Sequence, residues 1–191
     1  MSDVVDAIRI IGISGSLRKS SLNTSLIKLL KEKAAPEILM DVVTLDHMPF
    51  YNEDSDKAPQ IPTVEEFRNR IAISDGVLIA TPEYNHRIPG VLKNALGWAS
   101  RPHDNSCLKG KPVSIISSSP AFTGGVRAQY QLREALISMY AHLVMGPEVV
   151  LGGVNKKFVG DSYSDDNGLE FVLCSLHMLR EEIRLRRSTT A

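Results

Sequence analysis

The chain has 191 residues, of which 43% are hydrophobic and 23% charged, and its 22 basic residues balance 22 acidic ones. This length predicts a single domain, residues 1–191, with a sizeable core, and the charge balance argues against nucleic acid as a partner. The two cysteines and five histidines lack metal-ligand spacing, so we expect reduced thiols and no metal site. The start of the chain has no secretory signal pattern and the apolar runs are short, which predicts a cytoplasmic protein with no membrane insertion.

The first elements alternate between strand and helix patterns. Residues 8–14 are rich in β-branched side chains and apolar at both parities, which predicts a strand buried on both faces. Leucines at helical spacing follow over residues 22–30, and Ser20 or Ser21 can cap that helix. A second strand is expected over residues 39–45.

The rest of the chain continues this alternation. We expect further strands at 76–81, at 112–119 and within 144–151, and further helices at 64–73, 91–100, 128–143 and 165–187. Strands that alternate with helices form parallel βαβ units with right-handed crossovers. The sequence therefore predicts an α/β fold: a flavodoxin-like three-layer sandwich with a five-stranded parallel sheet of order 2-1-3-4-5.

Three polar or glycine-bearing loops follow the first, third and fourth expected strands. Their sequences are SGSLRKSS, TPEYNHRIPG and SSSPAFTGG. Ligands of open α/β sheets bind beyond the carboxyl ends of the strands, at the point where the strand order reverses. In the expected order that point lies between strands one and three, next to strand four, so we expect the three loops to meet there around a ligand.

The first loop has the chemistry of a phosphate site. It combines backbone N–H groups, several hydroxyls and the positive end of a helix. Arg18 can add a bidentate charged contact that a lysine does not reproduce. The residues expected to face the anion are Ser14, Ser16, Arg18, Ser21, Asn23 and Thr24.

Three known motifs do not fit this loop. A P-loop would need glycines at Ile13 and Arg18, and the dinucleotide fingerprint would need them at Ser14 and Leu17. A nucleophile elbow would need glycine at Ser16. An ordinary strand-to-helix turn that holds nothing is the remaining alternative, and the density of hydrogen-bond donors argues against it.

The other two loops suit a flat polar ring. Pro82 and Pro89 stiffen the second loop, so its backbone can bind the edge of such a ring, and Tyr84 can pack beside the ring or against a partner subunit. Gly124 and Gly125 permit close backbone approach in the third loop, after a triple serine.

Two long segments, GSLRKSSLN and TPEYNHRIPGVLKNALGWASRP, strongly resemble the NADPH-dependent FMN reductase family, which includes chromate and quinone reductases, azoreductases and plant NAD(P)H:quinone reductases. PFYNEDSD and GGVRAQYQLREAL are also similar to that family, and the match runs from the first strand to about Leu136. The resemblance implies FMN phosphate in the first loop and the isoalloxazine edge against residues 82–85, with the third loop closing the other side. His86 stands where many relatives carry tyrosine, and the bulky Phe122 lies in the third loop.

The loop chemistry and the resemblance together assign one set of residues to the cofactor. This set is Ser14, Ser16, Arg18, Ser21, Asn23, Thr24, Pro82, Glu83, Tyr84, Asn85, Ser117, Ser118, Ser119, Gly124 and Gly125.

The implied activity is an FMN-dependent NAD(P)H oxidoreductase with NADPH or NADH as co-substrate. It would reduce quinones by two electrons in a ping-pong order, with chromate, azo compounds and free flavin as further candidate acceptors and no catalytic side chain. The resemblance also implies a homodimer or homotetramer. A flavodoxin-like electron carrier and a non-catalytic flavin-binding redox sensor are the alternatives, and Arg18 and the neutral charge argue against the carrier.

Overall fold

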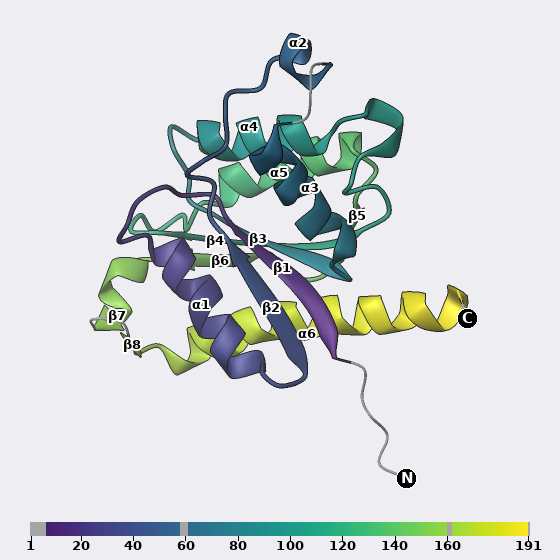
Figure 1. Cartoon of the computed structure of the whole chain (residues 1–191). Coiled ribbons are helices and arrows are strands. Elements are labelled where there is room, and N and C mark those ends of the chain that lie inside the picture. Colours follow the sequence, from purple (N-terminus) through teal and green to yellow (C-terminus); the bar gives the residue numbers. More distant parts are fainter. Residues whose placement is uncertain (1–6, 58–60, 160–161, 191) are drawn as a thin grey trace.

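A parallel β-sheet with helices on both faces forms the framework of the protein (Figure 1). The computed structural model describes residues 7–57, 61–159 and 162–190. The strands lie in the order β2-β1-β3-β4-β5, and β6 also pairs with β4. Their bounds are β1 (Ile8–Ser14), β2 (Ile38–Val43), β3 (Gly76–Thr81), β4 (Pro112–Ser119), β5 (His142–Leu143) and β6 (Val149–Gly152). The α/β class and the flavodoxin-like strand order are therefore confirmed.

Helices α3, α4 and α5 cover one face of the sheet, and α1 and α6 cover the other (Figure 1). The helices are α1 (Leu22–Ala34), α2 (Glu53–Asp56), α3 (Pro62–Ile73), α4 (Gly90–Ala99), α5 (Val126–Ser138) and α6 (Asp166–Thr190). Short elements complete the connections: the 3-10 turns η1 (His103–Asn105) and η2 (Val154–Lys156), and a hairpin of β7 (Phe158–Val159) and β8 (Ser162–Tyr163). Across the described ranges, no helix is both long and apolar enough to cross a membrane.

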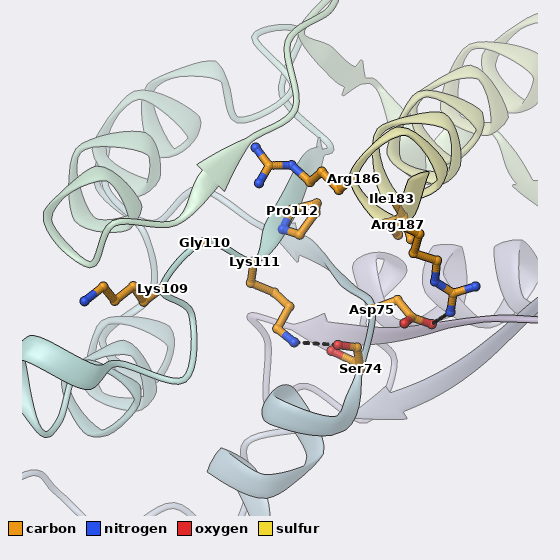
Figure 2. A pocket seen from close by; sticks show the side chains of 9 residues that line it. All are labelled: Ser74, Asp75, Lys109, Gly110, Lys111, Pro112, Ile183, Arg186 and Arg187. Carbon is orange, nitrogen blue, oxygen red and sulfur yellow. Dashed lines mark hydrogen bonds and ion pairs between the residues drawn. The ribbon is translucent and has the colours of Figure 1, made fainter. Parts of the chain in front are cut away.

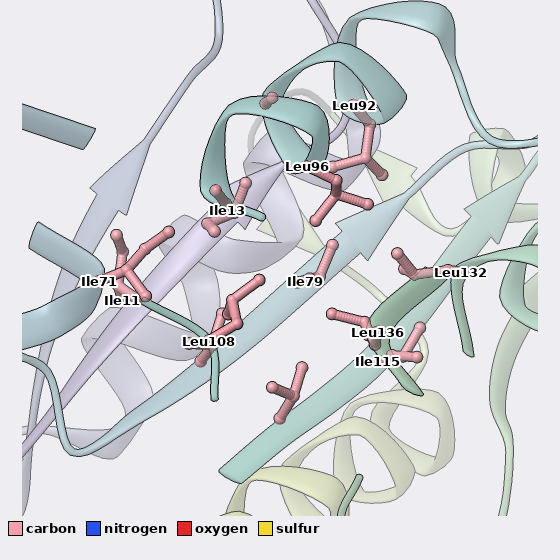
Figure 3. Close-up of a cluster of buried hydrophobic side chains, with 14 of the residues drawn as sticks. Ile11, Ile13, Ile71, Ile79, Leu92, Leu96, Leu108, Ile115, Leu132 and Leu136 are labelled. Atoms are coloured by element: carbon pink, nitrogen blue, oxygen red, sulfur yellow. The ribbon is translucent and has the colours of Figure 1, made fainter. Parts of the chain in front are cut away.

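Two hydrophobic clusters hold the layers together, one on each face of the sheet. Successive strand residues point to opposite faces, so β1 contributes Ile11 and Ile13 to one cluster and Ile8 and Ile10 to the other. Figure 3 shows the first cluster, in which Leu92 and Leu96 of α4 and Leu132 and Leu136 of α5 pack over Ile79 and Ile115. The apolar residues of α4 therefore pack against the sheet of the same chain.

The fifth strand differs from the prediction, because it is split into two short pieces. Both β5 and β6 pair with β4, whereas one strand was expected within residues 144–151. The preceding helix ends at Ser138 and not at residue 143, since Tyr140 adopts a left-handed conformation with φ of 57°. Pro147, which has no N–H to donate, separates the two pieces.

Gly12 lets α1 lie close against β1. A Cβ atom at this position would come within 2.7 Å of Ile27 Cγ2 and 3.2 Å of Met40 Sδ. Because α1 follows directly on the first polar loop, this contact also fixes where the loop and the first turn of the helix lie.

A hollow of about 330 Å³ lies at the amino ends of β3 and β4, which is the edge of the sheet opposite the polar loops (Figure 2). Lys111 donates from Nζ to the carbonyls of Ala72 (3.0 Å) and Ser74 (2.5 Å), and Arg187 pairs with Asp75 at 2.8 Å. Burial lowers the pKa of Lys111. These contacts join α6 and the start of β4 to the end of α3, so they act within the fold. The lining residues are Ser74, Asp75, Lys109, Gly110, Lys111, Pro112, Ile183, Arg186 and Arg187.

We predict that Gly12→Ala lowers the free energy of unfolding by roughly 1–3 kcal/mol, because the added methyl group displaces Ile27. Urea unfolding measures the change. Gly90→Ala is the matched control, since nothing lies within 4 Å of its added Cβ, and we expect a change within about 0.5 kcal/mol. Equal effects of the two substitutions would contradict the tight contact at Gly12.

Candidate functional site

The three polar loops meet at the carboxyl ends of β1, β3 and β4, as their positions in the sheet predict. They enclose a hollow of about 80 Å³. The hollow is lined by Ser16, Arg18, Ser21, Leu22, Asn23, Pro82, Glu83, Tyr84, Ser118, Ser119, Pro120 and Val154. Segments far apart in the sequence thus form one site at the reversal of strand order.

The first loop is shaped by its own hydroxyl groups. Ser21 is the N-cap of α1 and accepts a hydrogen bond from Thr24 N at 3.2 Å. Ser16 Oγ accepts from Arg18 N at 3.3 Å, and Ser14 Oγ accepts from Ser16 N at 3.4 Å. The first turn of α1 therefore opens on the hollow with its N–H groups and its positive dipole end.

Arg18 is an available cation at the edge of the hollow. Its side chain is exposed, and its one side-chain hydrogen bond among the described residues is a long one of 3.5 Å from Nη2 to Ser20 Oγ. It forms no ion pair with any residue that the structure describes. A guanidinium beside a helix N-terminus is suited to a phosphate dianion.

Asn23 connects the first loop to the third. Its Nδ2 donates to Ser118 O at 3.1 Å, and its Oδ1 accepts from Ser118 N at 3.2 Å. Asn23 is buried and lines the hollow, but its amide group is used by the backbone of Ser118. This residue therefore holds the walls of the site together.

Ser118 carries the one feature of the hollow that points directly to a ligand. Its side chain is 1% exposed, and its Oγ has no hydrogen-bond partner. Buried polar groups are normally bonded, and an unbonded one costs about 1–3 kcal/mol. A polar atom of a bound molecule would remove that cost, so the chemistry of the hollow fits FMN.

Glu83 attaches the second loop to the start of α5. Its Oε2 accepts from Arg127 N at 2.9 Å and from Ala128 N at 3.2 Å, and its side chain is only 10% exposed. The N-cap of α5 is Gly125, which has no side chain, so Glu83 supplies the capping carboxylate from another segment.

A tight turn forms the tip of the second loop. Tyr84 and Arg87 exchange two backbone hydrogen bonds of 2.9 Å, while Asn85 and His86 occupy the left-handed region with φ of 49° and 65°. His86 Nδ1 accepts from Arg127 Nη1 at 2.9 Å. The tip is thus held to α5 by its side chains as well as by Glu83.

The two glycines of the third loop permit close packing within the protein. A Cβ on Gly124 would lie 2.4 Å from Val150 Cγ1, and one on Gly125 would lie 3.0 Å from Ser117 Cβ. Both residues have positive φ, 59° and 95°. Phe122, in the same loop, is 94% exposed.

The predicted cofactor residues fall into two groups. Those that line the hollow are Ser16, Arg18, Ser21, Asn23, Pro82, Glu83, Tyr84, Ser118 and Ser119. Those that stand behind it or beside it are Ser14, Thr24, Asn85, Ser117, Gly124 and Gly125. The hydroxyls of Ser14 and Thr24 bond to each other at 2.7 Å, and Ser117 Oγ accepts from Gln129 Nε2 at 2.9 Å.

Sequence reasoning missed three lining residues: Leu22, Pro120 and Val154. Leu22 and Pro120 belong to segments already singled out, but Val154 comes from η2, after the fifth strand. The available signal was topological, because β6 pairs in parallel with β4 and so ends at the same edge of the sheet as Ser119.

Cys107 is not a nucleophile for this site. Burial raises the pKa of its thiol to about 11, so the thiol is protonated at neutral pH. Among the described residues, no group of histidine, cysteine and acidic side chains could hold a metal ion.

Comparison with known proteins gives a consistent result. Residues 8–156 match the model of the family described as NADPH-dependent FMN reductase. The chain is 37% identical to an NAD(P)H-dependent FMN reductase of Pseudomonas aeruginosa, covering 95% of this chain and 98% of that protein. It is 34% identical to a quinone reductase of Pseudomonas putida, covering 92% of this chain and 95% of that protein.

Among solved structures, the chain resembles the flavoenzyme NAD(P)H:(acceptor) oxidoreductase of Paracoccus denitrificans. The TM-score is 0.81 at 32% sequence identity, and the match covers 92% of this chain and 98% of the other.

We predict that Ser118→Ala weakens FMN binding about five- to tenfold, because the ligand loses one hydrogen bond. The stability of the flavin-free protein should stay within about 0.5 kcal/mol of wild type or rise, since the hydroxyl has no bond to lose. Calorimetric titration measures the FMN affinity, and urea unfolding measures the stability.

Ser117→Ala is the control: it breaks a buried hydrogen bond to Gln129, so we expect a loss of about 1 kcal/mol of stability. The assignment of Ser118 is wrong if both variants lose equal stability and Ser118→Ala binds FMN normally.

We predict that Glu83→Ala costs about 1 kcal/mol of stability and frees the second loop, because α5 loses its capping carboxylate. Hydrogen exchange at the amides of Tyr84 and Arg87 should accelerate. Glu83→Gln keeps an acceptor oxygen and should lose less. Unchanged exchange in Glu83→Ala would show that the loop is held by other contacts.

Proposed function

The chain belongs to the NADPH-dependent FMN reductase family and is therefore an oxidoreductase that uses FMN and NAD(P)H; we propose that the three loops bind FMN, with its phosphate end in the hollow, and that the protein reduces quinones. The observation that carries the placement of FMN is the buried, unbonded hydroxyl of Ser118. It lies in the same hollow as Arg18 and the first turn of α1.

In this proposal the first loop holds the phosphate. The N–H groups at the start of α1 and the hydroxyls of Ser16 and Ser21 donate to its oxygens, and the guanidinium of Arg18 neutralises its charge. Asn23 positions Ser118 through its two hydrogen bonds and so keeps the first and third loops at a fixed separation.

The second loop borders the ring in the proposed complex. Pro82, Glu83 and Tyr84 line the hollow, and the attachment of Glu83 to α5 fixes their backbone. Backbone N–H groups held in place stabilise negative charge better than mobile ones, because they need no reorganisation during the reaction. When bound, FMN supplies the redox chemistry, in which NAD(P)H and a proton reduce a quinone to the hydroquinone. The protein's part is to bind, orient and stabilise charge.

The acceptor and the order of events are finer parts of the proposal. Quinones come first among the acceptors, because curated relatives of this chain include quinone reductases. Chromate, azo compounds and free flavin are further candidates for the same exposed site. We propose a ping-pong order, in which NAD(P)⁺ leaves before the acceptor enters, and a cytoplasmic homodimer or homotetramer. Parallel lines in initial-rate plots would support that order.

We predict that Arg18→Ala weakens FMN affinity roughly 10- to 100-fold, because a charged hydrogen bond to the phosphate is lost. Turnover per bound FMN should stay within about threefold of wild type, since Arg18 contacts the phosphate and not the reacting ring. Arg18→Lys retains the charge without the bidentate geometry, so we expect an intermediate affinity. Titration of the flavin spectrum and NADPH–quinone assays give both numbers.

Three results would overturn these assignments separately. Unchanged FMN affinity in Arg18→Ala would remove the phosphate assignment. A wild-type protein that binds FMN but oxidises neither NADPH nor NADH in the presence of a quinone would favour an electron carrier, and one that binds no FMN would overturn the flavin site.

A further inference from the structure

A groove of about 430 Å³ is lined by one side of α1, by the loop before it and by β7. Figure 1 shows α1 beside the β7 and β8 strands. The groove is lined by Lys19, Ser20, Leu22, Ser25, Lys28, Leu29, Glu32 and Phe158. These residues come from the first polar loop, from one side of α1 and from β7. None of them was assigned to the cofactor by the loop chemistry.

The groove adjoins the hollow proposed for FMN. Leu22 lines both spaces, and Lys19 and Ser20 of the groove lie in the same loop as Arg18 and Ser21 of the hollow. A molecule with one end over the flavin site can therefore extend along α1 into the groove. The reduced nicotinamide dinucleotide has this shape, with its reacting ring at one end and its adenosine at the other.

Two cations in the groove are available for a ligand. Lys19 and Lys28 are exposed, and neither forms an ion pair or a side-chain hydrogen bond with the residues placed in the structure. Glu32, one turn beyond Lys28, is the single carboxylate of the lining, so positive charge prevails at the end near the hollow. In the hollow at the opposite pole, by contrast, Lys111 and Arg187 are bonded to protein groups (Figure 2).

The remaining lining suits a flat ring system with a sugar. Leu22 and Leu29 give an apolar floor, and Phe158 adds an aromatic ring that lies edge-on to Tyr163 at 5.0 Å between centroids. Stacking on an aromatic side chain is a common way to hold an adenine base. Ser20 and Ser25 supply hydroxyl groups between the apolar and the charged positions.

We propose that this groove binds the adenosine end of NADPH, and that Lys19 and Lys28 recognise its 2′-phosphate and so make the enzyme prefer NADPH to NADH. The inference rests on the proposed function, and it adds residues that determine specificity. NADH carries a hydroxyl in place of the 2′-phosphate, so the two lysines contribute to the binding of NADPH alone. Phe158 contacts the part that both nucleotides share.

The test compares wild type with Lys19→Ala, Lys28→Ala and the double variant, all loaded with FMN. We expect KM for NADPH to rise at least about tenfold in the double variant, because a charged contact to a phosphate is lost, while kcat stays unchanged. The kinetic constants for NADH should stay within about twofold. Lys31→Ala and Lys33→Ala are the matched controls, since they remove the same charge from the last turn of α1, outside the groove.

A binding measurement tests the groove independently of turnover. Titration calorimetry should show that 2′,5′-ADP binds wild type more tightly than 5′-AMP, and that the double variant loses this difference. A double variant with Lys28→Arg in place of Lys28→Ala should regain most of the difference in affinity between 2′,5′-ADP and 5′-AMP, because arginine returns the positive charge at position 28.

The outcomes separate this inference from the proposed function. Equal use of NADPH and NADH by wild type, or equal effects of the groove variants and the Lys31 and Lys33 controls, would overturn the assignment of the groove and leave the reductase activity standing. Failure of wild type to oxidise either nucleotide would overturn the proposed function. In that case, equal binding of 2′,5′-ADP and 5′-AMP would overturn the groove as well.

Discussion

The site depends on the paired hydrogen bonds between the side chain of Asn23 and the backbone of Ser118. They join segments that lie 95 positions apart in the sequence, and both residues are buried. Buried backbone N–H and C=O groups are almost always hydrogen-bonded in folded proteins, because leaving them unpaired costs free energy. The spacing between the first and third loops is therefore set by the protein itself, before any ligand binds.

The second loop is fixed by the same kind of contact. Glu83 reaches across to the N–H groups of Arg127 and Ala128, so the helix dipole of α5 and the carboxylate stabilise each other. Both contacts join backbone on one element to a side chain on another. A cofactor that enters such a site orders little of the protein on binding, which favours affinity and keeps the N–H groups aimed in fixed directions. Arg18, Tyr84 and Phe122 remain exposed around this rigid frame.

The fold could be predicted from the sequence because its signals are local. Apolar runs, helical leucine spacing and the cap at Ser21 each need only a few neighbouring residues, and the strand order follows from general rules of βαβ topology. The split of the fifth strand could not be predicted, since a two-residue strand such as β5 carries almost no pattern. The residues around the hollow were located by topology and by family resemblance. Their individual roles, above all those of Asn23 and Glu83, depend on partners distant in the sequence, and no local pattern reveals them.

The interrupted outer strand has a consequence for how copies of this protein can meet. A long, straight edge strand offers free N–H and C=O groups to another chain and invites sheet extension. Here the border next to β4 consists of two fragments, His142–Leu143 and Val149–Gly152, separated by a stretch that contains Gly146 and Pro147. A foreign strand finds no continuous row of partners along that border. Extension of the sheet along that border by a strand of another copy is thereby disfavoured.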